Sequence, residues 1–158
     1  MEIEARGHVE LWVIDYLQLI TNDASDSELD VISRVLKTLT LELKTHIVLL
    51  SQLNRDCERR ADKRPNLADL RGSGGIEQNA NNVVMIHRPG FYPELLRERR
   101  RRAKEDGKDP DEAAQKFQAT VTLIFTKTRN GPTGEARGVE WDPQHARFQE
   151  KTHGDRHF

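Results

Sequence analysis

The run Leu11–Ile20 constrains this chain most, because it is apolar almost throughout and carries a single carboxylate, Asp15. A continuous apolar run bounded by polar residues is typical of a strand buried on both faces of a parallel sheet. We expect a strand over residues 9–15, which places Asp15 at its C-terminal tip, where open α/β sheets form their ligand crevice. A carboxylate there can hold Mg²⁺ through its water shell, or it can simply cap a core strand.

The next fifty residues predict a βαβ unit. Ser25 and Glu28 are spaced as a capping box, and they precede a segment, residues 27–44, in which apolar residues recur at helical spacing. The apolar run 47–51 then predicts a second buried strand. A strand, a helix and a strand in this order favour a parallel pair, and hence the α/β class.

The rest of the chain predicts fewer regular elements. We expect long loops with short helical turns over residues 54–82, because this stretch is polar and contains Pro65 and three glycines. Strands are predicted at 83–87 and 119–127. The turn sequence 130–134 then predicts a hairpin that leads into residues 138–141.

Composition limits the possible function classes. The 158 residues suit one domain, and a net charge of −1 means that any contact with nucleic acid has to come from local patches. No apolar run approaches the roughly 18 residues of a membrane helix, and the N-terminus has no secretory signal pattern. The single Cys57 cannot form an intramolecular disulfide, so a cytoplasmic location is expected. The six histidines show no metal-ligand spacing.

Four motifs occur in an order that indicates a known family. They are VIDYLQLI at 13–20, SQLNR at 51–55, KRPNLADLRGSGGIEQNAN at 63–81 and KTRNGPTG at 127–134. Together they resemble the C-terminal RecA-like motor domain of DnaB-type replicative DNA helicases, over residues 9–92 and 117–149. The resemblance implies a RecA-like P-loop NTPase core across residues 1–149, with a mostly parallel sheet, helices on both faces and a C-terminal β-hairpin. It leaves residues 150–158 as a disordered tail.

The resemblance also implies nucleotide-site roles for residues at the predicted strand ends. Asp15 is expected to position Mg²⁺, and Gln52 to sense the γ-phosphate of ATP and couple its loss to movement of the segment that follows. Lys127 and Arg129 are expected to reach into a neighbouring subunit's nucleotide site, where Arg129 acts as an arginine finger. Without the resemblance, Gln52 would be a strand-end amide that satisfies loop backbone, and Lys127 and Arg129 ordinary surface residues.

The glycine-rich segment 69–78 resembles the family's DNA-binding loop. Its contacts with single-stranded DNA are expected from Arg71, Gly72, Ser73 and Gly74, because glycines let backbone N–H groups approach phosphate closely and Arg71 adds charge. The chain departs from the family pattern here, with Gly72 in place of a usual glutamate and Gly75 in place of a small side chain. The loop is therefore expected to be more flexible than its relatives; the alternative is a plain surface loop.

Residues 94–116 form a charged insertion with no counterpart of this length in the family pattern. Eight bases and seven acids alternate in blocks, including Arg99–Arg102. Such a segment is typical of a solvated charged helix or a disordered insertion. The sharper alternative is that the arginines contact DNA phosphates, in which case their removal should weaken single-strand binding and flatten its salt dependence.

One motif is missing from the sequence: no G-x-x-x-x-G-K-[ST] phosphate loop occurs in it. We therefore expect a motor domain that is incomplete on its N-terminal side and catalytically incomplete alone, with exposed apolar sheet surface that favours self-association or marginal stability. The function implied is part of an ATP- and Mg²⁺-dependent hexameric helicase that translocates on single-stranded DNA, with primase and a loader as partners. The alternative is a non-enzymatic DNA-binding or ring-partner module that lends its finger in trans.

Overall fold

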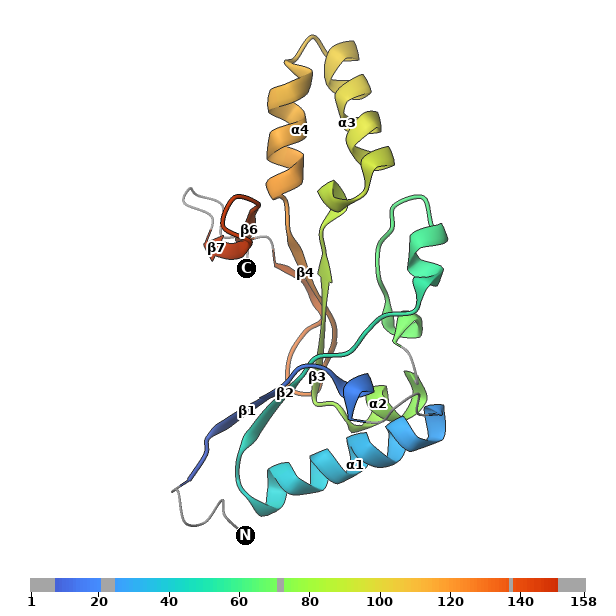
Figure 1. Cartoon of the computed structure of the whole chain (residues 1–158), viewed down its shortest axis with the longest axis vertical. Helices are drawn as coiled ribbons and strands as arrows, with labels where there is room; N and C mark the ends of the chain where they lie inside the picture. Colours follow the sequence, from blue (N-terminus) through green and yellow to red (C-terminus); the bar gives the residue numbers. More distant parts are fainter. Residues whose placement is uncertain (1–7, 21–24, 71–72, 137, 151–158) are drawn as a thin grey trace. The chain divides into compact units, whose positions relative to one another are not determined.

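The parallel βαβ unit predicted near the N-terminus is present in the computed structural model, which describes residues 8–20, 25–70, 73–136 and 138–150. Strand β1 (Leu11–Ile14) pairs in parallel with β2 (His46–Leu49), and α1 (Asp26–Glu42) connects them (Figure 1). The capping box at the start of α1 is also present, since the Glu28 carboxylate accepts the Ser25 backbone N–H at 2.7 Å. The spacing of Ser25 and Glu28 therefore predicted the start of this helix correctly.

The chain divides into two compact units, each described here by itself. The first unit comprises Met1–Arg55 and Leu67–Asn81, and the second Asp56–Asn66 and Asn82–Phe158. The core of the first unit is a cluster of Leu17, Leu29 and Ile76. Leu17 belongs to the short helix η2 (Leu17–Leu19), and Ile76 to α2 (Ser73–Asn79), so the residues after β1 and the glycine-rich segment pack onto α1.

Helix α2 lies where the sequence predicted a flexible loop, and that prediction is wrong for residues 73–79. Apolar packing of Ile76 and two side-chain hydrogen bonds hold the helix against α1: the Asn79 amide donates to Ser33 Oγ at 2.8 Å and to Asp30 Oδ1 at 3.3 Å. Gly75 permits this approach, because a Cβ built there would lie 1.9 Å from Asp30 Oδ1. The glycine is therefore a packing position rather than a source of flexibility.

The first unit leaves one face of its two-stranded sheet uncovered, so the prediction that these strands are buried on both faces is wrong, while the expected exposed apolar sheet surface is present. Leu11 and Val13 of β1 are 54% and 64% exposed, and Val48 of β2 is 50% exposed. Because these residues alternate with more buried ones and Val13 pairs with Val48, they share a face. The exposed face is apolar, which supports the expectation of self-association or limited stability.

The second unit is built on an antiparallel sheet. Strand β4 (Thr122–Thr128) pairs with β3 (Asn82–His87) on one side and β5 (Gly134–Ala136) on the other. The turn at 130–134 joins β4 to β5, which confirms a hairpin at this turn, but its second strand is residues 134–136 and not the predicted 138–141. Strands β6 (Val139–Asp142) and β7 (Arg147–Glu150) instead form a separate antiparallel hairpin, which was not predicted. Parallel pairing within the described residues is confined to β1 and β2, so the prediction of a mostly parallel sheet holds only for that pair.

The charged insertion between β3 and β4 is a helical hairpin. After the short helix η5 (Pro89–Phe91), α3 (Pro93–Glu105) and α4 (Pro110–Ala119) run side by side (Figure 1). Asp109 caps α4, since its carboxylate accepts the N–H groups of Asp111 and Glu112 at 2.8 and 3.1 Å. The helical alternative for this insertion is thereby confirmed, and the disordered one is wrong.

Short helical turns fill the polar region after β2, as predicted. They are η3 (Arg55–Arg59) and η4 (Leu67–Asp69). Residues 150–158 were predicted to be a disordered tail. Glu150 is instead the last residue of β7, and residues 151–158 lie outside the described part of the chain. In the described ranges, no helix is long and apolar enough to cross a membrane.

Candidate active site at the ends of β1 and β2

Asp15 and Gln52 lie at the C-terminal ends of two neighbouring parallel strands. Asp15 directly follows β1, and Gln52 comes three residues after the end of β2. The two strands are in parallel register, with Ile14 opposite Leu49, so both side chains belong to the same edge of the sheet. Both residues are exposed. The sequence prediction that this edge gathers a carboxylate and an amide is confirmed by the strand pairing, while their chemical roles stay predictions.

Gln18 fixes the backbone at Gln52, and the sequence analysis assigned it no role. Its Nε2 donates to Ser51 Oγ at 3.0 Å, and its Oε1 accepts the backbone N–H of Gln52 at 3.2 Å. A further backbone bond, from the Leu17 N–H to the Leu50 carbonyl at 2.9 Å, continues the contact between the two strand ends. Gln18 is the one polar residue in the run 17–20, and this is the feature of the sequence that could have indicated a structural role for it.

The donor atoms at this edge suit a magnesium ion held mainly by water and by a nucleotide. In the described residues, no group of three or more His, Cys, Asp or Glu side chains is placed to enclose a metal. Asp15 offers one exposed carboxylate, and Gln52 a neutral amide. Mg²⁺ usually keeps several waters and binds one or two carboxylates together with substrate phosphates, so this donor set fits such an ion and does not form a cage of its own.

The segment after Gln52 joins the start of the predicted DNA-binding loop. The Asn54 N–H donates to the Asp69 carbonyl at 2.6 Å, and Leu53 and Leu70 form an antiparallel bridge. Arg71 and Gly72 lie outside the described residues, and Ser73 and Gly74 lie in the first turn of α2 instead of in a loop. The structure thus joins the strand of Gln52 to the residues that immediately precede Arg71.

Lys127 and Arg129 form a separate group in the second unit. Lys127 is half-buried near the end of β4, where it pairs with Val83 of β3, and Arg129 is exposed just after the strand. The turn that follows is closed by the Thr128 hydroxyl, which donates to the Gly131 carbonyl. These two residues therefore share a strand end with each other, while Asp15 and Gln52 belong to the first unit.

The second unit also contains a polar cluster that the sequence analysis did not single out. The Arg88 guanidinium lies 3.8 Å from the centre of the Trp141 ring, and burial lowers the pKa of Arg88. Burial and the nearby charge of Arg64 lower the pKa of His87. Arg88 Nε and His87 Nε2 are buried without a hydrogen-bond partner among the described residues.

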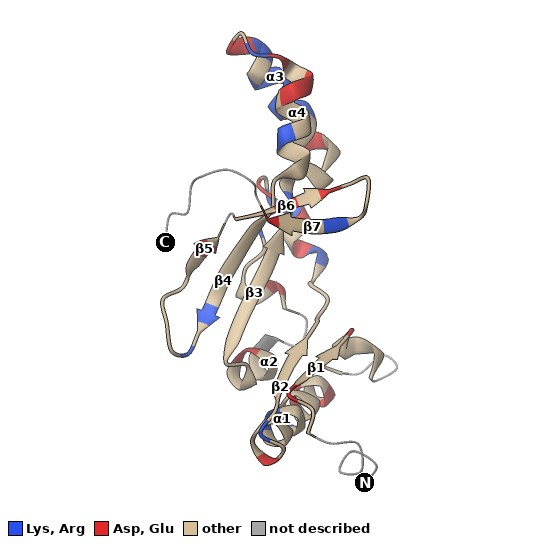
Figure 2. Cartoon of the chain, turned by 90° about the vertical axis from the view of Figure 1, so that its left-hand side faces the viewer, with Lys and Arg blue, Asp and Glu red and all other residues tan. Residues whose placement is uncertain are grey.

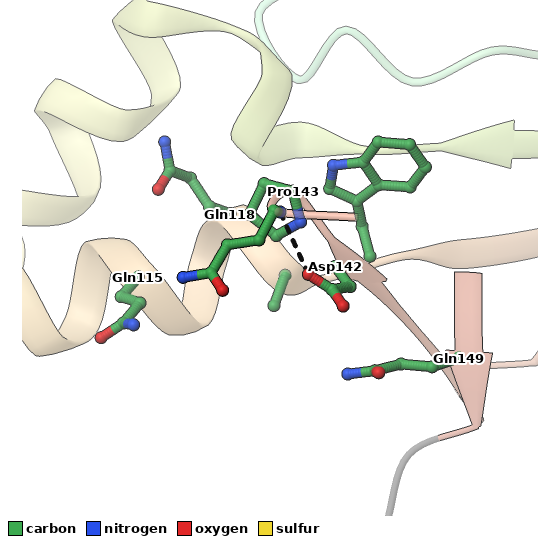
Figure 3. A pocket seen from close by; sticks show the side chains of 8 residues that line it. Gln115, Gln118, Asp142, Pro143 and Gln149 are labelled. Atoms are coloured by element: carbon green, nitrogen blue, oxygen red, sulfur yellow. Dashed lines mark hydrogen bonds between the residues drawn. The ribbon is translucent and has the colours of Figure 1, made fainter. Parts of the chain in front are cut away.

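A small cavity of about 230 Å³ lies between α4 and the β6–β7 hairpin (Figure 3). Asp142 is fixed at its edge, because its carboxylate accepts the Gln144 N–H at 3.0 Å and the His145 side chain approaches it at 2.6 Å. The lining is dominated by amide side chains around one indole ring and comprises Gln115, Gln118, Ala119, Trp141, Asp142, Pro143, Gln144 and Gln149.

Comparisons with known proteins identify the family to which the chain is similar. The family model of the DnaB-like helicase C-terminal domain matches residues 1–150. Relatives include the replicative DNA helicases DnaB of Leifsonia xyli, 38% identical over 92% of this chain and 28% of the relative, and of Mycobacterium leprae, 38% identical over 84% and 21%. The chain therefore spans less than a third of the length of these relatives.

Two solved structures show the same fold. A helicase ATPase domain has 31% sequence identity and a TM-score of 0.67, over 89% of this chain and 44% of that structure. A DnaB-like replicative helicase, described with its interactions with primase, has 31% identity and a TM-score of 0.64, over 87% and 29%. These likenesses confirm the RecA-like α/β fold, and the match over residues 1–150 means that the chain belongs to the DnaB-like helicase C-terminal domain family.

Proposed function

We propose that this chain supplies the Mg²⁺-positioning, phosphate-sensing, DNA-contacting and finger elements of an ATP-driven replicative DNA helicase. The observation that carries the proposal is that Asp15 and Gln52 follow paired parallel strands at one sheet edge, with Gln18 hydrogen-bonded to Ser51 Oγ and to the Gln52 backbone N–H. Family membership over residues 1–150 supports the reaction class.

The first proposed role is that of Asp15 at the nucleotide. A magnesium ion bound between ATP and the protein would neutralise charge that develops on the transferring phosphoryl group. Asp15, exposed at the end of β1, orients that ion through water, and its single negative charge suits this outer position.

The second proposed role is that of Gln52 as a phosphate sensor. Its side-chain amide donates to a γ-phosphate oxygen or to the attacking water, and loses that partner after hydrolysis. Gln18 holds the Gln52 backbone, so the side chain starts from a defined position. The bond from Asn54 to Asp69 gives the segment after Gln52 a physical link to the residues before Arg71. Movement of Gln52 can therefore displace residues 71–74, the segment proposed to contact single-stranded DNA.

The third proposed role belongs to Lys127 and Arg129, which act on the nucleotide of a neighbouring subunit. A planar, permanently charged guanidinium is suited to stabilise the γ-phosphoryl group in the transition state. Arg129 is exposed at the mouth of a strand–turn–strand element, a position from which it can reach another subunit. This role requires assembly into a ring, which we propose to be a hexamer. We also propose primase as a partner, because one structural relative is described with its interactions with primase.

These 158 residues contain no G-x-x-x-x-G-K-[ST] sequence, so we propose that they do not hydrolyse ATP by themselves. A second candidate function follows from the same feature: a non-enzymatic module that joins a helicase ring and supplies Arg129 in trans. The exposed apolar face of β1 and β2 supports this candidate, since it is a surface that another chain can cover.

The proposal is tested on the purified chain by measuring ATP turnover with Mg²⁺ and, separately, binding of a single-stranded oligo-dT. We expect no turnover, together with DNA binding that weakens as salt is raised. DNA-stimulated turnover would contradict the proposed dependence on a phosphate loop elsewhere. Absence of DNA binding at low salt would remove the DNA-contacting part of the proposal.

A further inference from the structure

Helix α3 carries a row of basic side chains along one face. Six basic and only three acidic residues occur in its sequence, PELLRERRRRAKE. Arg97, Arg100, Arg101 and Lys104 are spaced i, i+3, i+4 and i+7, which places them on one side of an α-helix. These four residues are called the basic stripe below. From Arg97 to Lys104 it extends about 10 Å along the helix, at 1.5 Å per residue.

The hairpin holds the basic stripe outward. Ala103 of α3 and Ala114 of α4 are 4% and 3% exposed, so the two helices meet along these small residues. Arg100 lies at the border of that contact, where its Nε is 3.3 Å from Asp111 of α4. The remaining members of the basic stripe are exposed, and Figure 2 shows the basic and acidic segments distributed over the hairpin.

The two ends of the basic stripe differ from its middle. Arg101 is held by Glu98 and Glu105, at 2.8 Å each, and Arg100 by Asp111. In the described part of the chain, neither Arg97 nor Lys104 lies within salt-bridge distance of an acid, and the charge of Arg97 acts only at longer range, on the Glu94 carboxylate. Exposed ion pairs are weak, so Arg100 and Arg101 can also exchange their acids for phosphate. The stripe thus offers two to four cations in a row to a polyanion.

An exposed aromatic ring lies beside the start of α3. Phe91, in η5, is 70% exposed and is held edge-on against Tyr92, with ring centres 5.6 Å apart. Proteins that bind single-stranded nucleic acid combine a basic track for the backbone with aromatic rings on which bases stack. An acidic protein segment would explain the cations and would leave the exposed ring without a role.

We propose that the basic stripe and Phe91 form a second site for single-stranded DNA, distinct from residues 71–74. Arg97 and Lys104 contact backbone phosphates, and Phe91 stacks on one base. Such contacts carry no sequence preference, because every strand presents phosphates and base faces. The choice of DNA as the polyanion rests on the proposed function, whereas the position of the site rests on the hairpin itself.

The test compares two double variants of the full chain that remove the same charge from the same helix. R97Q/K104Q removes the two ends of the basic stripe, and R99Q/R102Q removes two exposed cations from the other side of α3. Glutamine has nearly the helix propensity of arginine and lysine, so both variants are expected to fold. Helicity and elution volume check this, and binding of a fluorescent oligo-dT is measured without nucleotide across a salt series.

We expect R97Q/K104Q to weaken binding about 25-fold at 0.1 M salt and to reduce the salt slope by about 1.4, since each single-strand phosphate contact contributes about 0.7. R99Q/R102Q should weaken it less than about threefold, and F91A about fivefold or more. Equal losses in the two double variants would mean a general charge effect and would overturn the site. Unchanged oligo-dT binding by R97Q/K104Q would also overturn it.

The outcomes also separate this site from the proposed function. If the unaltered chain binds oligo-dT and R71A weakens it while R97Q/K104Q does not, the loop at residues 71–74 is the DNA contact and the basic stripe is not. If R97Q/K104Q weakens binding and R71A does not, the stripe is supported and the proposed role of Arg71 fails.

Discussion

The Gln18 side chain accepts the backbone N–H of Gln52 at 3.2 Å, across 34 positions of sequence, and so ties the residue after one strand to the segment after its neighbour. The same amide donates to the Ser51 hydroxyl at 3.0 Å. This arrangement leaves the Gln52 side chain exposed while its backbone is fixed. The phosphate-sensing role proposed for Gln52 needs both properties, because a sensor has to be positioned before the phosphate arrives and has to be able to release it afterwards.

Replacement of Gln18 by alanine should loosen this strand end. Two hydrogen bonds are lost, so we expect the free energy of unfolding to fall by about 1 kcal/mol and the Gln52 amide to exchange its hydrogen faster. Hydrogen-exchange mass spectrometry with a urea titration measures both effects. Q18E keeps the acceptor for Gln52 and should protect that amide, and L19A, at a residue 63% exposed, serves as a control. Unchanged exchange at Gln52 in Q18A would contradict the role of Gln18.

Much of the fold could be predicted from apolar periodicity alone. The strands at 11–14, 46–49, 82–87 and 122–128 and the helix at 26–42 all lie close to their predicted positions. The apolar residues of α1 recur at helical spacing, so its position could be read from the pattern. The continuous apolar runs of β1 and β2 predicted burial on both faces, but Leu11, Val13 and Val48 are exposed. The direction of the pairing between β3 and β4 could not be read this way, because an antiparallel and a parallel strand have the same alternation when one face is buried.

Helix α2 escaped prediction, and helix α3 was predicted only as one of two alternatives. Helix α2 contains Gly74 and Gly75, which disfavour a helix locally, and the burial of Ile76 against Leu17 and Leu29 compensates for this cost. Helix α3 has nine charged residues among 13 and no continuous apolar stripe, so its sequence left a helix and a disordered insertion as alternatives. Of the candidate site, the placement of Asp15 and Gln52 was predictable from strand ends, while Gln18 was not, because its contacts join segments far apart in sequence.

The two glycines of α2 should respond oppositely to alanine. A Cβ on Gly75 would lie 1.9 Å from Asp30 Oδ1 and 2.5 Å from Asp30 Cβ, so G75A should destabilise the first unit by about 1–3 kcal/mol. A Cβ on Gly74 meets nothing within 4 Å, and G74A should stabilise the chain by about 0.5–1 kcal/mol. Urea unfolding of both variants measures the difference. Equal midpoints for G74A and G75A would disprove the close approach of α2 to α1.

The α3 ion-pair network should be sensitive to acid. Hydrogen bonds from Arg101 and Arg102 lower the pKa of Glu98 from 4.5 to about 2. Because the folded-state pKa lies below the unfolded value, the unfolded chain binds more protons between these two values. The stabilisation is therefore present above pH 4.5 and is lost as the pH falls towards 2.

An NMR titration of the Glu98 side-chain carboxyl carbon measures this shift directly. We expect its midpoint near pH 2, and a loss of α3 helicity over the same interval that is absent in E98Q. The Arg97→Gln variant is a suitable control, because the hydrogen bonds that Glu98 accepts come from Arg101 and Arg102. A midpoint near 4.5 would show that the Glu98 network does not form in solution.

Replacement of Arg129 should lower ATP turnover at the nucleotide site of a neighbouring subunit. When this chain is mixed with an intact DnaB-type helicase, we expect mixed rings that elute together. In those rings the R129A chain should lower DNA-stimulated ATP turnover about tenfold or more relative to the unaltered chain, since arginine fingers contribute at least this much. R59A, which alters an arginine that is exposed on η3, is the control. Separate elution would argue against a ring partner, and equal turnover with R129A against the finger.

The central claim, that Asp15 and Gln52 act together on a Mg²⁺-bound nucleotide, is tested most directly in a chimaera. Residues 1–150, the range that matches the family model, replace the corresponding part of the Leifsonia xyli helicase, which is 38% identical over 92% of this chain, and DNA-stimulated ATP turnover is measured. We predict that the chimaera is active, that D15N and Q52A each lower turnover at least about a hundredfold, and that E42Q, at an exposed carboxylate, leaves it unchanged. An active chimaera that keeps its turnover with either D15N or Q52A would contradict the assignment of that residue to the nucleotide site.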